Sequence, residues 1–177
     1  EVPLWVAARS PITFDYAVAN NANIMSWPLT MPFAEAERYR EQLNDAIAKS
    51  ETPFTGKFAM MRHSAIYENE ADRQLALGAL RHTLGQFGNL MQKKGDVING
   101  FPERVPVDQL DGNMRYDPDT LEENLMFGSA EQCAENLVAS TDIGVDAYLS
   151  YAPMGLDMDM QKRSLSTFIE RVMPHAA

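Results

Sequence analysis

A serine follows an apolar segment near the start of the chain, at a position where chemistry is possible. Val2–Ala8 is an almost unbroken apolar run, and Arg9, Ser10 and Pro11 come directly after it. The run predicts a buried strand of a parallel sheet, and Ser10 followed by Pro11 predicts the first turn of a helix. Free N–H groups at a helix start attract anions, and the Ser10 hydroxyl and the Arg9 guanidinium add donors for a phosphate. The alternative is that Ser10 only caps its helix, which by itself contributes about 1 kcal/mol.

A second polar pair, Arg62 and His63, lies inside an apolar segment that predicts a strand over residues 57–67. These two side chains either are buried and hydrogen-bonded within the core or line a binding site. We favour the structural interpretation, because buried polar groups usually find hydrogen-bond partners.

The familiar signatures of catalysis and cofactor binding are absent from the sequence. It contains no G-x-G-x-x-G motif, no Walker-type loop and no G-x-S-x-G elbow. The histidines, His63, His82 and His175, fall on different predicted elements without the spacing of metal ligands. Asp157 and Asp159 precede a helix and are typical of favourable first-turn charges. We therefore predict no metal site, and the residues alone do not identify a catalytic group.

Composition restricts the class of partner. The chain has 177 residues, 45% hydrophobic and 23% charged, which is typical of one globular domain. Its formal net charge of -10 argues against nucleic acid or an anionic membrane as a partner, so a bound phosphate needs a local site. No apolar run approaches the ~20 residues of a membrane span, and no secretory leader is visible. The single cysteine, Cys133, excludes an internal disulfide and favours a cytoplasmic location.

Hydrophobic periodicity predicts four consecutive strand–helix units. The predicted strands cover residues 2–8, 22–26, 57–67 and 145–152. The first three are followed by helices that begin at Ser10, near Pro32 and at Glu70, and the fourth is followed by a helix that ends at Pro174. Four such units predict an α/β fold with a parallel sheet and right-handed crossovers. Two architectures fit this order: a small doubly wound sheet, or half of an eight-stranded barrel, which as a whole typically needs ~250 residues.

Between the third and fourth predicted strands the periodicity stops. Residues 92–115 are rich in glycine, proline and scattered charges, and irregular segments longer than ~12–15 residues are usually functional lids or disordered. We predict a mobile flap here, with disorder as the alternative. Order resumes at Asp117 and Pro118, which predict a short helix. Ser129–Gln132 is a capping box for the next helix, which Gly144 ends.

Three separated segments resemble the bacterial luciferase-like flavin-dependent monooxygenases, which are eight-stranded barrels. The first resembles the fifth strand of that family with the serine-containing turn after it, and the second resembles its arginine-bearing seventh strand with the start of an acidic helix. The third is the most specific. The segments are Val2–Pro11, then Met61–His63 with Glu70–Ala71, then Phe127–Gln132 with Gly144–Asp146, Ser164–Leu165, Phe168 and Val172–Pro174.

The resemblance covers essentially the whole chain but matches only the carboxy-terminal half of the family, strands five to eight. It implies a TIM-barrel half: one domain over residues 1–177, with parallel strands, outer helices and an irregular flap at about 92–115. It also implies that the amino-terminal half is absent. In the family that half supplies much of the flavin-ring pocket and the usual catalytic histidines, so the catalytic residues stay unknown.

The resemblance places candidate site residues around the barrel mouth. In the family, a serine after strand five contacts the flavin phosphate. Ser10 matches it, with Arg9 and the Ala8 backbone beside it, although Arg9 departs from the small residue expected there. Barrel sites lie at the carboxyl ends of the strands. By that geometry, residues after three further strands are predicted to face the same barrel mouth as Ser10. They are Ser26 and Trp27, Tyr67 and Glu68, and Tyr151, Pro153 and Met154.

The resemblance implies an FMN-dependent monooxygenase as the complete protein. Reduced FMN, supplied by a flavin reductase, would react with oxygen to give a flavin hydroperoxide that oxygenates a small organic substrate. The alternatives are a deazaflavin-dependent enzyme that transfers hydride, and a non-catalytic flavin-binding or structural subunit. The half-barrel alone is expected to be inactive. Its open strand edges predict a homo-oligomer or pairing with the missing half.

Overall fold

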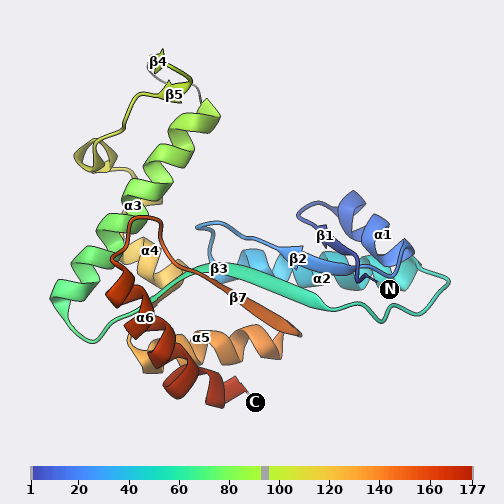
Figure 1. The fold of residues 1–177 in the computed structure, drawn as a ribbon. Coiled ribbons are helices and arrows are strands. Elements are labelled where there is room, and N and C mark those ends of the chain that lie inside the picture. Colours follow the sequence, from blue (N-terminus) through green and yellow to red (C-terminus); the bar gives the residue numbers. More distant parts are fainter. Residues whose placement is uncertain (1, 93–95, 177) are drawn as a thin grey trace.

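The computed structural model describes residues 2–92 and 96–176, which form a five-stranded parallel sheet with packed helices (Figure 1). The strands are β1 (Trp5–Ala7), β2 (Asn23–Ser26), β3 (Phe58–Ile66), β6 (Met126–Gly128) and β7 (Ala147–Tyr151), and a separate hairpin contains β4 (Val97–Ile98) and β5 (Phe101–Pro102). The helices are α1 (Pro11–Ala19), α2 (Phe33–Lys49), α3 (Glu70–Gln92), α4 (Pro118–Asn124), α5 (Ala130–Asp142) and α6 (Met158–Thr167). Short 3₁₀ helices cover Val107–Leu110, Met114–Tyr116 and Met173–Ala176, and a π-helix covers Phe168–Val172.

Strand β3 is the centre of the sheet. Ser26 of β2 lies opposite Met60, and Tyr151 of β7 lies opposite His63. β6 pairs with the last three residues of β3. The backbone hydrogen bonds of β3 alternate between its two edges. Odd-numbered residues bond to β2 and β6: Lys57, just before β3, accepts from Ile24, and Tyr67, just after it, donates to Gly128. Even-numbered Phe58 accepts from Asp146, which precedes β7. β2 and β6 therefore share one edge of β3, and β7 has the other edge to itself.

The two faces of β3 pack against different helices. Even-numbered Phe58 and Met60 lie in a core with Tyr39 and Leu43 of α2, because alternate side chains of a strand point to the same face. Odd-numbered Ala65 packs on the other face, in a core with side chains of α3 and α4. We call the even-numbered face, which packs on α2, the helix-covered face of the sheet; on the odd-numbered face, α3 and α4 cover the region around Ala65.

Helix starts and stops follow the signals in the sequence. In the capping box of α5, the Ser129 N–H donates to Gln132 Oε1 at 2.9 Å and the Gln132 N–H donates to Ser129 Oγ at 3.4 Å. Gly144, which follows α5, has a φ of +82°, a conformation that favours glycine. Asp157 accepts from the N–H groups of Asp159 and Met160 at the start of α6, which confirms the interpretation of this acidic pair.

Two strands differ from the sequence-based expectation. Residues 2–8 predict a strand with both faces buried, but β1 has three residues, and Val2 and Trp5 are 93% and 45% exposed. The reason is that β1 pairs only with β2 within the described residues and lacks a covering layer on its inner face. Strand β6 is an additional strand that the sequence analysis missed, because three residues are too short for a visible alternation.

The segment predicted as a flap has regular local structure where the structure describes it. Its residues 93–95 lie outside the described residues. The β4–β5 hairpin turns at Asn99 and Gly100, both with positive φ, as a two-residue turn of the I′ type requires. The hairpin lies at the far end of α3, well away from the sheet (Figure 1). None of the helices among the described residues has the length and apolar character needed to cross a bilayer.

Candidate active site

Four ring side chains meet at the carboxyl ends of the central strands. Trp27 follows β2, His63 lies on the inner face of β3, Tyr151 ends β7, and Phe87 comes from α3. The ring centroids of His63 and Tyr151 are 4.7 Å apart and stacked, and those of Trp27 lie 5.7 Å from His63, 5.9 Å from Tyr151 and 6.3 Å from Phe87. We call these four residues the aromatic cluster. Trp27 and Tyr151, which the sequence predicts to face one barrel mouth, are thus in ring contact.

Two polar atoms in the aromatic cluster have no hydrogen-bond partner. Nδ1 of His63 and Nε1 of Trp27 are both buried, and neither bonds to any other described residue. His63 is 1% exposed, and this burial lowers the pKa of His63 to about 4, so the imidazole is neutral near pH 7. Buried polar groups are nearly always paired, so these two ring nitrogens without partners are candidate hydrogen-bonding groups for a water or a ligand.

Ser26 has a structural role beside this cluster. Its side chain is fully buried on the helix-covered face, and its hydroxyl donates to the Ala8 carbonyl at 2.7 Å. The Ala8 N–H in turn donates to the Met25 carbonyl at 3.0 Å. Both backbone groups of Ala8 are thus used between β1 and β2, which leaves them unavailable to a phosphate.

Ser10 is exposed at the start of α1. The side chain of Thr13 accepts hydrogen bonds from the N–H groups of Arg9 and Ser10, at 3.3 and 3.2 Å. The Ser10 hydroxyl lies 3.3 Å from the Thr13 hydroxyl. Arg9 turns toward α2, where its Nε donates to the phenol of Tyr39 at 3.1 Å. Ser10 and Arg9 are both exposed, but the Arg9 Nε already has a partner in Tyr39.

The remaining predicted mouth residues lie in other surroundings. Tyr67 is buried against α3 and α4, and its hydroxyl donates to Glu122, which also pairs with Arg73. Glu68 forms an exposed ion pair with Arg171 at 2.7 Å. Met154 has an exposed side chain, and its carbonyl accepts from the Thr83 hydroxyl at 3.1 Å. The structure does not bring these side chains into the aromatic cluster.

Arg62, the neighbour of His63, faces the opposite side of β3 and is 4% exposed. Its Nη1 donates to the carbonyls of Met31 and Asn124, both at 2.8 Å. Within residues 2–92 and 96–176 no carboxylate pairs with it. Arg62 thus ties the loop after β2 to the end of α4, in agreement with the structural interpretation, although its Nη2 has no partner there.

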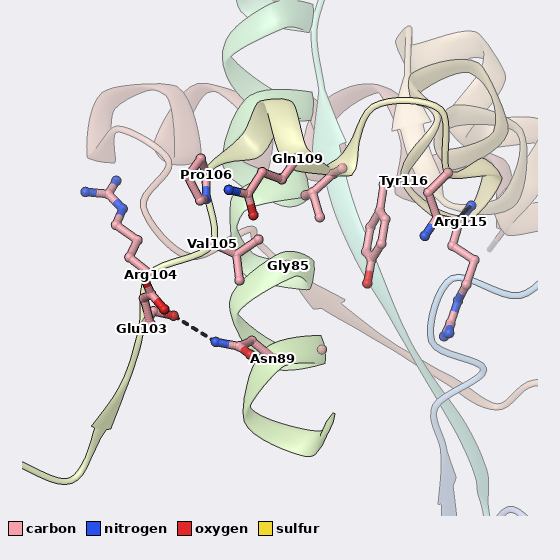
Figure 2. A pocket seen from close by; sticks show the side chains of 12 residues that line it. Gly85, Asn89, Glu103, Arg104, Val105, Pro106, Gln109, Arg115 and Tyr116 are labelled. Carbon is pink, nitrogen blue, oxygen red and sulfur yellow. Dashed lines mark hydrogen bonds between the residues drawn. The ribbon is translucent and has the colours of Figure 1, made fainter. Parts of the chain in front are cut away.

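Segment 103–116 wraps around α3. The amide of Gln86 bonds to both backbone groups of Val105, and Nδ2 of Asn89 donates to the Glu103 carbonyl at 2.7 Å. Figure 2 shows the resulting cavity, about 460 Å³, with Tyr116 reaching down toward α3. A Cβ on Gly88 would lie 2.9 Å from the Tyr116 hydroxyl, so glycine permits this close approach.

A smaller cavity of about 160 Å³ lies between α3, the loop after β2 and the Met114–Tyr116 turn. Leu29, Phe87, Arg115 and Tyr116 are among its lining residues. Phe87 also belongs to the aromatic cluster, so the cavity and the cluster are contiguous. Phe87 is not recognisable as a site residue in the sequence, because its spacing matches the core stripe of α3. Arg115 and Tyr116 are not recognisable either, because they lie at the end of an aperiodic segment.

The comparison with known proteins agrees with this arrangement. Residues 1–147 match the family described as luciferase-like monooxygenase. The oxygenase component of the flavin-dependent trigonelline monooxygenase of Acinetobacter baylyi is 26% identical over 172 residues, which are 97% of this chain and 48% of that protein.

Solved structures show the same fold over about half of their length. The oxygenating constituent of 3,6-diketocamphane monooxygenase from Pseudomonas putida, in complex with FMN, has a TM-score of 0.64 at 14% identity; the match covers 100% of this chain and 49% of that one. An F420-dependent secondary alcohol dehydrogenase has a TM-score of 0.64 at 18% identity, with the same coverage. The chain thus spans about half the length of these relatives. Its parallel sheet and outer helices correspond to half of a TIM barrel, and the chain belongs to the luciferase-like monooxygenase family.

Proposed function

We propose that this chain supplies the carboxy-terminal half of the flavin site of a flavin-dependent monooxygenase. The observation that carries the proposal is the aromatic cluster, in which Trp27 and His63 each have a buried ring nitrogen without a partner. A planar heteroaromatic ring that stacks on aromatic side chains and bonds at its edge fits these surroundings. The trigonelline monooxygenase relative is named as flavin-dependent, which supports the same cofactor class.

Different residues of the chain would contact different parts of the flavin. Trp27 and Tyr151 offer ring surfaces, and neutral His63 can donate or accept one hydrogen bond at Nδ1 without adding a charge. The exposed Ser10 hydroxyl at the start of α1 would donate to the phosphate of FMN, because the N–H groups of Arg9, Ser10, Thr13 and Phe14 already have partners within the chain. Segment 103–116, held on α3 by Gln86 and Asn89, would restrict the access of water. When bound, reduced FMN would supply the activation of oxygen for transfer to a small organic substrate.

The same comparison supports the proposed partners. The relative is an oxygenase component, which supports a separate reductase as the source of reduced FMN. Oxygen and a small organic molecule are the proposed co-substrates. The rest of the ring pocket would come from an amino-terminal half-barrel, since the relatives extend over about twice the length of this chain.

A deazaflavin is the second candidate cofactor. The observation in its favour is the F420-dependent alcohol dehydrogenase among the proteins of the same fold. Such an enzyme would transfer hydride and consume no oxygen.

The test is an anaerobic titration of the full-length protein with reduced FMN and, separately, with reduced F420, followed by measurement of oxygen consumption. We expect binding of reduced FMN, oxygen uptake that depends on the substrate, and weaker binding of FMN by Trp27→Leu. Tyr16→Leu, which changes an exposed ring on α1, is the matched control and should bind normally. Binding of F420 alone, without oxygen uptake, would replace this proposal by the deazaflavin candidate.

A further inference from the structure

The cavity beside the aromatic cluster has two chemically distinct parts. Its apolar part is formed by Leu29, Leu84, Phe87 and Met91, and its polar part by Thr30, Arg115 and Tyr116. The volume is about 160 Å³, and a cavity of about 150 Å³ is large enough to hold benzene. The volume and the lining therefore suit a small apolar body, such as one aromatic ring, that carries a polar group toward Arg115 and Tyr116.

Arg115 has no carboxylate partner in the described parts of the chain. Two arginines of α3 do have such partners: Arg73 pairs with Glu122 at 2.5 Å, and Arg81 pairs with Asp111. Arg104, beside the neighbouring cavity, has no ion pair within the described residues, but its side chain points away from that cavity. Neither an ion pair nor a hydrogen bond of the Arg115 guanidinium occurs within residues 2–92 and 96–176, whereas its backbone N–H is held by Asn113. Arg115 is exposed and lines this cavity, so in a chain of formal net charge -10 its guanidinium is a local group that can attract an anion.

Tyr116 provides a second donor next to Arg115. Figure 2 shows both side chains extending to the same side, with Arg115 directed toward the loop that follows β2. The phenol of Tyr116 lies over Gly88, and no described residue bonds to its hydroxyl. A carboxylate accepts hydrogen bonds from a guanidinium and a phenol together, and a neutral amide would leave the guanidinium charge without its counterion.

From these contacts we infer that the cavity binds a small organic carboxylate with a flat apolar body. Arg115 and Tyr116 hold the carboxylate, and the body lies against Phe87, one ring away from Trp27. This assignment names the substrate class of the proposed monooxygenase and rests on that proposal for its catalytic meaning. The binding itself needs only residues of this chain.

Binding is tested with benzoate and its neutral counterpart benzamide, by saturation-transfer NMR on the chain without any flavin. We expect saturable binding of benzoate and at least about tenfold weaker binding of benzamide, as the loss of a charged hydrogen bond predicts. Arg115→Gln should weaken benzoate binding by a similar factor. Arg104→Gln is the matched control, because Arg104 borders the neighbouring cavity and points away from it (Figure 2), and it should bind benzoate normally.

Each other result would overturn the inference. Equal binding of benzoate and benzamide would mean that the cavity selects only apolar bodies. Equal losses in Arg115→Gln and Arg104→Gln would mean general electrostatic attraction, and absence of benzoate binding to a chain with a normal melting transition would remove the site. The benzoate measurement contains no flavin, so the two proposals can fail separately. Benzoate binding without FMN binding would refute the proposed function alone. FMN binding without benzoate binding would refute this inference alone.

Discussion

His63 and Tyr151 are register partners on β3 and β7, and their rings stack at a centroid distance of 4.7 Å with 26° between the planes. The stacking leaves the imidazole 1% exposed and its Nδ1 without a partner among the described residues. A charged imidazolium is strongly disfavoured in these surroundings, which makes the cluster dependent on pH.

The first prediction concerns stability in acid. Burial lowers the pKa of His63 to about 4, below its ordinary value of 6.5, so between these values the unfolded chain binds a proton that the folded chain does not. The stabilisation is complete above pH 6.5 and is lost as the pH falls toward 4. Its size is about 3 kcal/mol. Denaturant titrations at pH 7, 5.5 and 4 should show this slope, and His63→Phe should remove it.

An exposed histidine serves as the control for that measurement. His175→Gln should keep the same dependence of unfolding free energy on pH as the unchanged chain, since His175 lies on the surface. An unchanged slope in His63→Phe would show that other groups cause the acid sensitivity.

The second prediction separates ligand binding from helix capping at Ser10. Ser10→Ala should weaken FMN binding by the full-length protein about tenfold and change stability little, since no described backbone N–H donates to its hydroxyl. Thr13→Val should do the opposite and destabilise the protein by about 1 kcal/mol, because the Thr13 hydroxyl accepts from two N–H groups at the helix start. Fluorescence titration and thermal melting measure the two effects. Unchanged FMN affinity in Ser10→Ala would refute the phosphate contact.

The third prediction uses the close approach of Tyr116 to α3. A Cβ added at Gly88 would meet the phenol oxygen at 2.9 Å, so Gly88→Ala should displace Tyr116 and weaken benzoate binding several-fold. Replacing helical glycine by alanine favours the helix by up to about 1 kcal/mol, which opposes the cost of moving Tyr116, and a thermal melt of Gly88→Ala shows whether the variant still folds.

Gly78 is a matched control on the same helix. No atom lies within 4 Å of a Cβ built there, so Gly78→Ala should raise the free energy of unfolding by up to about 1 kcal/mol and leave benzoate binding unchanged. Equal effects of the two variants on benzoate binding would contradict the role of Tyr116.

The fourth prediction concerns association. Trp5 and Leu4 are 45% and 54% exposed around β1, which pairs on one side only within the described residues. Open strand edges and exposed apolar side chains promote association, so we expect this chain to self-associate or to bind an amino-terminal half-barrel. Light scattering of the isolated chain should give a mass above 19.8 kDa, and a stable monomer would contradict the prediction.

Local signals in the sequence predict most of the helices and strands. The capping box at Ser129, the turn at Gly144 and the apolar period of α2 lie where their residue types require. The exposure of β1 and the pairing of β6 depend on contacts between distant segments, and an apolar run alone does not reveal them.

The candidate site is only partly visible in the sequence. Trp27 and Tyr151 follow from the rule that barrel sites lie at strand ends, which also predicts Tyr67. Tyr67 lies elsewhere because β3 is followed by α3, whose side chains and those of α4 bury its ring. Phe87 has the same spacing as a core residue, so its contact with Trp27 depends on the direction in which α3 leaves the sheet.

The alternation along β3 also limits how this protein can change in evolution. Arg62 and His63 are adjacent, yet one bonds to loops on the helix-covered face and the other belongs to the aromatic cluster. Insertion of a single residue before them would exchange their faces, placing a guanidinium among the rings and an imidazole beneath the loops. The length of β3 should therefore be invariant among functional homologues, while the hairpin beyond α3 can lengthen or shorten freely.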